Sequence, residues 1–347
     1  MITNTSNPFN LTFGKEPPHM IARYGQSSEI ISTFEAEEPS QQVYMITGVR
    51  GIGKTVFMTS ISKIFKNNPD WIVVELNSSG ELLKEFAAKM YNEKSLSNAF
   101  EADGINLSFW GIGVDLKKAK PITDLETAVE RMLDRVVKDK KRILVTIDEV
   151  SNTKEMRYFA GAFQILIRHD YPIFLLMTGL YGNINKLQNE DNLTFLYRAP
   201  KIYLTSLNIY RISELYGQLL GVSKDDASTL AKMTKGYPFA FQVLGYFMYE
   251  KKCDLKKAVN ESRLYLDEYV YDKIWTELSE KEKDILAYIA IKKNTEVRKI
   301  KEDLNIRPNE ISVYRDRLIK KGILDGSRRG YIDFTLPFMS EYIQEHY

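Results

Sequence analysis

Short apolar runs alternate with longer amphipathic stretches along the first two thirds of the chain. The runs are apolar at successive positions rather than at alternate ones, and each ends near a turn residue. Continuous apolarity indicates strands buried on both faces, as in a parallel sheet that is covered by helices. The predicted strands are residues 43–47, 71–74, 143–147 and 173–177.

The stretches between these strands carry apolar residues at helical spacing. Thr123 and Glu126 have the spacing of a capping box at the start of one predicted helix. The alternation predicts a series of βαβ units with right-handed connections, and therefore the α/β class. The predicted apolar helix faces are Phe57, Ile61, Ile64 and Phe65; Leu125, Val129, Met132, Leu133 and Val136; and Met156, Phe159, Ala160, Phe163, Leu166 and Ile167.

After residue 204 the strand signals stop, and residues 208–275 have a helical pattern. Gly236-Tyr237-Pro238 interrupts it, because glycine ends one helix and proline is tolerated at the first position of the next. Ser279 and Glu282 form a second capping box. Helices at about 280–291, 295–304 and 308–321, with a hairpin near residues 325–330, then predict a winged helix-turn-helix.

Composition adds exclusions rather than a function. The formal net charge of +2 is too small to indicate a partner, and 44% hydrophobic with 27% charged residues is ordinary for a folded protein. The single cysteine, Cys253, fits a reducing compartment, and the three histidines have no metal-ligand spacing. No apolar run approaches a membrane span, and residues 1–10 do not resemble a signal peptide. We therefore expect a cytoplasmic protein.

The segment Gly48-Val49-Arg50-Gly51-Ile52-Gly53-Lys54-Thr55 carries the clearest chemistry. It matches G-x-x-x-x-G-K-[ST], directly after a predicted strand and at the start of a predicted helix, which is the context of a phosphate loop. Its glycines let backbone N–H groups approach phosphate oxygens. Lys54 is expected to lie between the outer phosphates, and the Thr55 hydroxyl to bind Mg²⁺. A glycine-rich turn with a solvated lysine is the structural alternative.

Two acids, Asp148 and Glu149, follow the predicted strand at residues 143–147. Alone they could cap a helix, but together with a phosphate loop they have the Walker B arrangement. We expect Asp148 to hold Mg²⁺ and Glu149 to orient and deprotonate the attacking water, which favours a hydrolase over a passive nucleotide binder.

Two further residues are weaker candidates. Thr178 follows the strand at residues 173–177, where a polar side chain can sense the outer phosphate, or can simply end the strand. Arg198 precedes a short strand at residues 201–204, where it can reach a phosphate of its own or a neighbouring subunit as an arginine finger, or can be a surface residue.

These motifs together resemble the AAA+/STAND group of P-loop ATPases, specifically the archaeal-type ATPases and the related replication initiators. The resemblance covers nearly the whole chain and includes Arg23 in Met20-Ile21-Ala22-Arg23, similar to the segment that cups the adenine. Thr178 stands where AAA+ members often have asparagine, and no sensor-2 arginine follows Pro238, which is more like STAND proteins. The resemblance implies an ATPase that works as a slow switch. The absence of an Asn-Lys-x-Asp segment favours ATP over GTP.

The predicted architecture is therefore a P-loop NTPase parallel sheet covered by helices, then a small helical lid domain and a C-terminal winged helix. We expect the nucleotide-binding domain at residues 1–205, with residues 1–41 leading into it, the lid domain at 206–276 and the winged helix at 277–347. The expected ligands are ATP or ADP with Mg²⁺. Pro238 is expected to place its helix over the nucleotide.

The predicted winged helix is locally basic. Residues 292–329 hold 12 Lys and Arg against 6 Asp and Glu, a local excess of six positive charges. Because phosphate contacts supply most of the affinity for DNA, this stripe favours double-stranded DNA as a partner. The alternative function is a STAND-like signalling or defence ATPase whose C-terminal unit contacts a protein client, and a metabolic kinase is a third alternative. Self-association as a homo-oligomer is a further candidate interaction. The predicted DNA contacts are Arg315, Arg317, Lys320, Lys321, Arg328 and Arg329.

Overall fold

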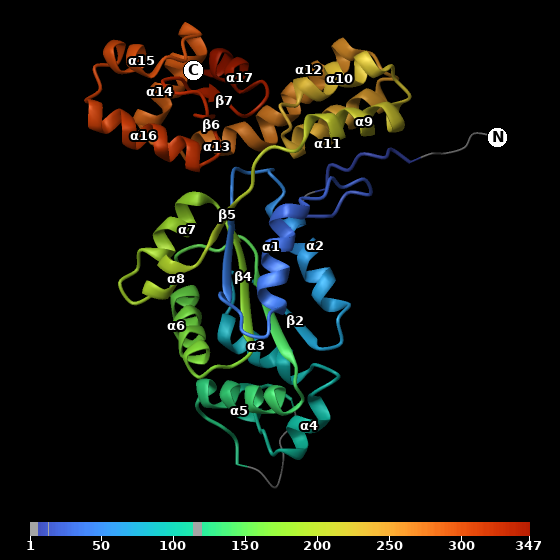
Figure 1. Cartoon of the computed structure of the whole chain (residues 1–347), viewed down its shortest axis with the longest axis vertical. Coiled ribbons are helices and arrows are strands. Elements are labelled where there is room, and N and C mark those ends of the chain that lie inside the picture. The colour runs from blue at the N-terminus through green and yellow to red at the C-terminus, as the bar shows by residue number, and fades with distance from the viewer. Residues whose placement is uncertain (1–5, 13, 114–119) are drawn as a thin grey trace, which may run out of the picture. The chain divides into compact units, whose positions relative to one another are not determined.

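The computed structural model describes residues 6–12, 14–113 and 120–347 (Figure 1). It divides into two compact units. The sheet unit is Arg23–Thr47 with Phe57–Ile202, and the lid unit is Met1–Ala22, Gly48–Val56 and Tyr203–Tyr347, within the described ranges. The phosphate loop thus groups with the C-terminal half of the chain. The division into three domains stays a prediction.

A five-stranded sheet in the order β2-β3-β4-β1-β5 forms the centre of the sheet unit. Strands β2 and β3, β3 and β4, and β4 and β1 pair in parallel, as predicted for a P-loop fold. The strands are β1 (Val43–Thr47), β2 (Trp71–Leu76), β3 (Arg142–Ile147), β4 (Ile173–Gly179) and β5 (Lys201–Tyr203).

Helices cover both faces of this sheet. The helices up to β5 are α1 (Tyr24–Glu35), α2 (Lys54–Lys66), α3 (Leu82–Tyr91), α4 (Ser97–Ala102), the 3₁₀ turn η1 (Ser108–Trp110), α5 (Leu125–Lys138), α6 (Lys154–Arg168), α7 (Tyr181–Gln188) and α8 (Thr194–Arg198).

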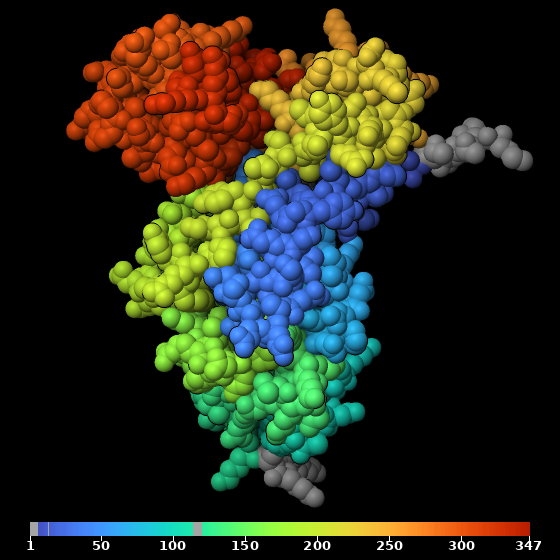
Figure 2. Space-filling view, viewed as in Figure 1, coloured from blue at the N-terminus to red at the C-terminus, as the bar shows by residue number. Residues whose placement is uncertain are grey.

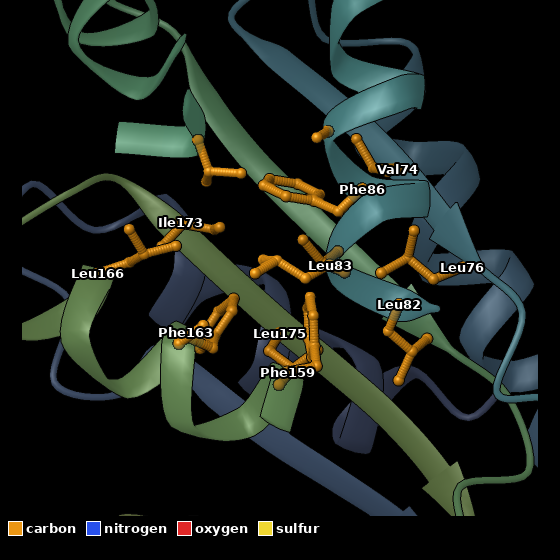
Figure 3. Packing of buried hydrophobic residues seen from close by; sticks show 14 of the residues in the cluster. Val74, Leu76, Leu82, Leu83, Phe86, Phe159, Phe163, Leu166, Ile173 and Leu175 are labelled. Carbon is orange, nitrogen blue, oxygen red and sulfur yellow. The ribbon is translucent and has the colours of Figure 1, made fainter. Parts of the chain in front are cut away.

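Alternate strand residues divide between the two faces. On one face, Val74 of β2 and Leu175 of β4 belong to a buried cluster with Phe86 of α3 and Phe159 and Phe163 of α6 (Figure 3). On the other face, an aromatic group packs against α1 and α2; it consists of Phe34, Tyr44, Phe65, Trp71 and Phe174. Because both faces are covered, β1 and β4 are buried at every position, which confirms the interpretation of the continuous runs.

Two details of the predicted helices are wrong. Helix α5 is capped by Asp124, whose side chain accepts a hydrogen bond from the Thr127 N–H, rather than by a Thr123–Glu126 box. Asp is a more favoured N-cap residue than Thr, and its carboxylate accepts from the N–H of the third helical residue. Ile64 is 46% exposed, so the buried face of α2 includes fewer residues than its apolar pattern predicts.

The lid unit is helical apart from one hairpin. Its elements are α9 (Ile209–Leu220), α10 (Lys224–Met233), α11 (Pro238–Glu250), α12 (Leu255–Leu266), the π-helix η2 (Asp267–Tyr271), α13 (Asp272–Thr276), α14 (Glu280–Lys292), α15 (Val297–Asp303), α16 (Pro308–Lys320), β6 (Leu324–Asp325), β7 (Asp333–Phe334) and α17 (Met339–His346). The short strands β6 and β7 pair antiparallel.

The N-terminal residues contribute to the lid unit. Phe9 is buried in a cluster with Tyr216 of α9 and Phe241 of α11. The Asn10 N–H donates to the Gln242 side chain, 2.9 Å away. Residues far apart in sequence therefore build one core, which local patterns could not predict.

The predicted capping box of Ser279 and Glu282 forms at the start of α14. Ile311 and Leu318 of α16 are buried, whereas Tyr314 is half-buried. In the space-filling view, the segment from α14 to α17, orange to red, is one continuous body (Figure 2). Across the described ranges, no helix combines the length and apolarity that a membrane crossing requires.

Candidate nucleotide-binding site

Three glycines give the phosphate loop its shape. Gly48, Gly51 and Gly53 have φ angles of 152°, 72° and 92°, which residues other than glycine rarely adopt. Such a backbone turns successive N–H groups toward one concave side, where an anion can bind. Helix α2 begins directly afterwards at Lys54, so the positive end of its dipole adds to the same side.

The Lys54 ammonium lies against the loop itself. It donates to the carbonyl oxygens of Gly48, 3.0 Å away, and Val49, 3.1 Å away. The C=O and N–H groups of a trans peptide point in opposite directions, so fixing these carbonyls also fixes the N–H groups that follow them. The loop is therefore organised around the lysine that the sequence predicts to meet the phosphates.

Tyr237, another residue of the lid unit, also bonds the phosphate loop. Its hydroxyl donates to the Arg50 carbonyl oxygen at 2.5 Å, and its side chain is buried. Burial raises the pKa of Tyr237 well above its usual value, so the hydroxyl stays protonated and able to donate. A Cβ atom at Gly51 would overlap the Tyr237 hydroxyl. Gly51 is thus required both by its φ angle and by the close approach of this ring.

The acids of the predicted Walker B motif lie at the end of β3, next to β4 in the sheet. The buried Thr178 hydroxyl donates to the Asp148 carboxylate and accepts the Glu149 N–H at 3.1 Å. Glu149 has a φ of 52°, in the left-handed region, and its side chain is exposed. Thr178 therefore holds Asp148 in place and stabilises an unusual backbone conformation at Glu149.

The donor types of Thr55 and Asp148 fit Mg²⁺. A hydroxyl and a carboxylate are hard oxygen donors, and Mg²⁺ takes few protein ligands of this kind beside phosphate oxygens. In the described part of the chain, there is no group of three or more His, Cys, Asp or Glu residues that could form a metal site on protein ligands alone.

The remaining predicted site residues, Arg198, Pro238 and Arg23, lie at the ends of three different helices. Arg198 is exposed at the end of α8, and Pro238 is the first residue of α11. Arg23 immediately precedes α1 and is half-buried; burial lowers its pKa to about 10. An exposed Arg198 suits a finger that acts on another subunit and also suits a surface role, so its function stays a prediction.

Three of the six predicted DNA contacts have internal partners. Arg315 donates to the Gly326 carbonyl at 2.9 Å and braces the hairpin, and Lys320 pairs with Asp316. Lys321 pairs with the buried Glu282. Burial acts to raise the pKa of Glu282, but the hydrogen bonds from Lys321 and Ser279 outweigh it and lower that pKa. Lys321 thus neutralises a buried acid inside its own unit.

The other three predicted DNA contacts are exposed arginines. The Arg317 guanidinium lies 5.7 Å from the Tyr314 ring centre, and that of Arg328 lies 3.8 Å from the Tyr331 ring centre. Stacking on a ring uses the face of the guanidinium and leaves its N–H edge able to donate. Arg329 is exposed beside Arg328 in the hairpin turn.

Two residues with a part in the site were not predicted. The sequence indicates only a helix break at Tyr237, and its place between Gly236 and Pro238 is the one local signal of a special role. Glu277 pairs with Arg50 of the loop, with the Arg50 Nη2 and Nε atoms 2.5 and 3.1 Å from the Glu277 Oε1 atom. Nothing in the local sequence marks Glu277, because 227 residues separate the partners.

Two family models match the chain. One, described as an ATPase domain predominantly from Archaea, matches residues 31–244, and a domain of unknown function matches residues 268–343. No curated protein matches the sequence.

The fold is similar to solved structures at low sequence identity. A Walker-type ATPase of Pyrococcus abyssi is 14% identical with a TM-score of 0.63, over 94% of this chain and 96% of that one. The ORC2 protein of Aeropyrum pernix, solved in ADPNP–ADP complexes, is 15% identical with a TM-score of 0.59, over 96% of each chain. At these identities the likeness confirms the predicted P-loop fold with its helical C-terminal part.

Proposed function

Because the chain belongs to the family of ATPase domains found predominantly in Archaea, we propose that it binds ATP with Mg²⁺ at the phosphate loop and hydrolyses it as a nucleotide-driven switch. One observation carries the proposal. The loop at residues 48–55 has left-handed glycines at Gly51 and Gly53, and the Lys54 ammonium donates to the carbonyl oxygens of Gly48 and Val49. This conformation is suited to a polyphosphate.

The proposed chemistry assigns a role to each motif. Loop N–H groups and Lys54 bind the outer phosphates, and Thr55 and Asp148 hold Mg²⁺, which neutralises phosphate charge when bound. Glu149 accepts a proton from the attacking water, and Thr178 positions both acids through its hydroxyl. Arg23 and Pro238 border the base in this proposal, and Arg198 acts as a finger.

Removing the Lys54 charge tests nucleotide binding. Lys54→Ala leaves the apolar sheet intact, so the protein should fold while its affinity for MgATP falls about 10- to 100-fold, the effect of one hydrogen bond to a charged group. Isothermal titration calorimetry measures the affinity. Lys66→Ala, which removes an exposed lysine at the other end of α2, is the matched control and should bind normally. Wild-type affinity in folded Lys54→Ala protein would refute the assignment.

We further propose that the switch acts on double-stranded DNA through a winged helix formed by α14, α15, α16 and the hairpin. The observation that favours DNA is the set of exposed arginines on α16 and the hairpin: Arg317, Arg328 and Arg329. Their N–H edges can donate to phosphate oxygens, whereas Arg315 and Lys321 bond groups inside their own unit and Lys320 pairs with Asp316 on the helix surface.

The alternative is a STAND-like signalling or defence ATPase whose C-terminal unit binds a protein. It shares the phosphate loop and Walker B chemistry and differs only in the client. A DNA-binding measurement separates the two, and it is described in the Discussion. A cytoplasmic location and self-association stay predictions.

A further inference from the structure

Two residues far along the chain, Tyr237 and Glu277, bond the phosphate loop at Arg50. Tyr237 lies between α10 and α11, and its buried hydroxyl bonds the Arg50 carbonyl. Since the Arg50 carbonyl and the Gly51 N–H belong to one trans peptide, this bond also sets the direction of the Gly51 N–H. That N–H is one of the groups expected to meet a phosphate.

The Arg50 side chain makes the second attachment. Two of its guanidinium nitrogens approach one oxygen of Glu277, and the two side chains are 32% and 36% exposed. Glu277 lies between α13 and α14, inside the match to the domain of unknown function. Arg50 of the loop is thus bonded at its backbone by Tyr237, between α10 and α11, and at its side chain by Glu277. Glu277 belongs to the segment at residues 268–343, which we call the C-terminal domain.

The loop also faces this domain at other residues. A cavity of about 590 Å³ lies between the two, lined by Val49 and Ile52 of the loop and by Lys320 and Phe334 of the C-terminal domain. Gly322 comes close, since a Cβ there would lie 3.3 Å from the Val49 nitrogen. The Arg50–Glu277 pair is thus a polar attachment by which movement of the domain would pull on the loop.

We propose that Tyr237 and Glu277 are positioning residues for the phosphate loop, and that Glu277 lets the C-terminal domain set how long a nucleotide stays bound. The proposal rests on the proposed function, because it concerns the same loop. When the pair is broken, the peptide after Arg50 gains freedom, its N–H leaves the phosphate more often, and the nucleotide dissociates faster. By linkage, bound nucleotide must in turn favour the domain position in which the pair is made.

The test is a double-mutant cycle on the rate at which a fluorescent ADP analogue leaves the protein. Arg50→Gln and Glu277→Gln should each raise the dissociation rate roughly two- to five-fold, the effect of one half-exposed ion pair. The double variant should match either single variant, because the pair is already lost. Tyr237→Phe removes only the hydroxyl and should raise the rate roughly five-fold. Glu280→Gln, at an exposed acid at the start of α14, is the control.

A second readout separates coupling from a merely structural role. ADP should slow amide hydrogen exchange at residues 272–280 in the wild-type protein, and Glu277→Gln should abolish that change while leaving the urea midpoint within the wild-type range. Single-variant effects that multiply in the double variant, or rates equal to wild type, would overturn the inference while ATP binding stands. A wild-type protein that binds no nucleotide would refute the proposed function and this inference together.

Discussion

Glu149 occupies a left-handed backbone conformation that non-glycine residues seldom adopt. The conformation costs on the order of 1 kcal/mol, and the hydrogen bond from the Glu149 N–H to the buried Thr178 hydroxyl offsets it. Backbone strain of this kind is concentrated at functional sites. Here it presents an exposed carboxylate directly after Asp148, consistent with the proposed general base.

Substitution at Glu149 should separate binding from chemistry. Glu149→Gln keeps the shape and removes the base, so ATP affinity should stay near wild type while hydrolysis falls about 100-fold or more. Asp148→Asn should instead weaken the Mg²⁺ dependence of binding. Calorimetry and phosphate release measure the two effects. Turnover by Glu149→Gln at the wild-type rate would rule out the general-base role.

At the scale of elements, the π-helix η2 connects α12 to α13. Its first residue, Asp267, is only 8% exposed, and its Oδ1 atom has no hydrogen-bond partner among the described residues. Burial, with smaller contributions from Glu345 and Asp272, raises the pKa of Asp267 to about 6, against the opposing effect of His346 and Arg263. A π-helix with a buried, incompletely paired acid is a weak point in this connection.

This acid should make stability depend on pH. The folded-state pKa of Asp267 lies above the reference value of 3.8, so the folded protein binds the proton more tightly than the unfolded chain. The contribution of Asp267 to stability therefore falls as pH rises from about 4 to about 6, and the full penalty remains above that range. Asp267→Asn should raise the free energy of unfolding by about 1 to 3 kcal/mol at pH 8 and by far less at pH 4.5.

Urea unfolding at the two pH values measures this gain. Asp284→Asn, at an exposed acid of α14, is the control and should show little gain at either pH. An Asp267→Asn gain of equal size at both pH values would contradict a titrating carboxylate and indicate a steric cause instead.

At the scale of the whole molecule, the proposed winged helix of α14, α15, α16 and the hairpin is tested for DNA binding. If Arg328 and Arg329 contact phosphates, binding releases counterions and affinity falls steeply with salt. Replacing both with alanine should reduce the slope of log affinity against log salt by roughly one to two units. Fluorescence anisotropy with duplex DNA across a salt series, with and without ATP, measures this slope.

The matched control is Lys256→Ala with Lys257→Ala, which removes two exposed lysines from α12 and should leave the slope unchanged. ATP should change the affinity if the lid unit couples the two ligands, and DNA should then change ATP affinity by the same factor. Absence of binding at low salt in either nucleotide state would favour the protein-client alternative.

The sequence by itself determined the phosphate loop, the parallel sheet and the order of the elements. These features follow from local patterns: glycines where the backbone must be left-handed, continuous apolar runs where strands are covered on both faces, and proline at the first position of α11. The capping box of Ser279 and Glu282 was equally local, and it formed. Thr123 and Glu126 had the same spacing, but Asp124, a more favoured N-cap residue than Thr, caps the helix instead.

Only the tertiary structure decided which distant groups meet. The placement of β4 beside β3 lets the Thr178 hydroxyl bond Asp148 and Glu149. The order of the strands in a sheet cannot be predicted from the sequence of any one strand. Tyr237 and Glu277 reach Arg50 across 187 and 227 residues, and Lys321 pairs with Glu282 instead of remaining a surface charge. Periodicity records which face of an element is buried. It does not record what lies against that face, because this depends on how the elements pack together.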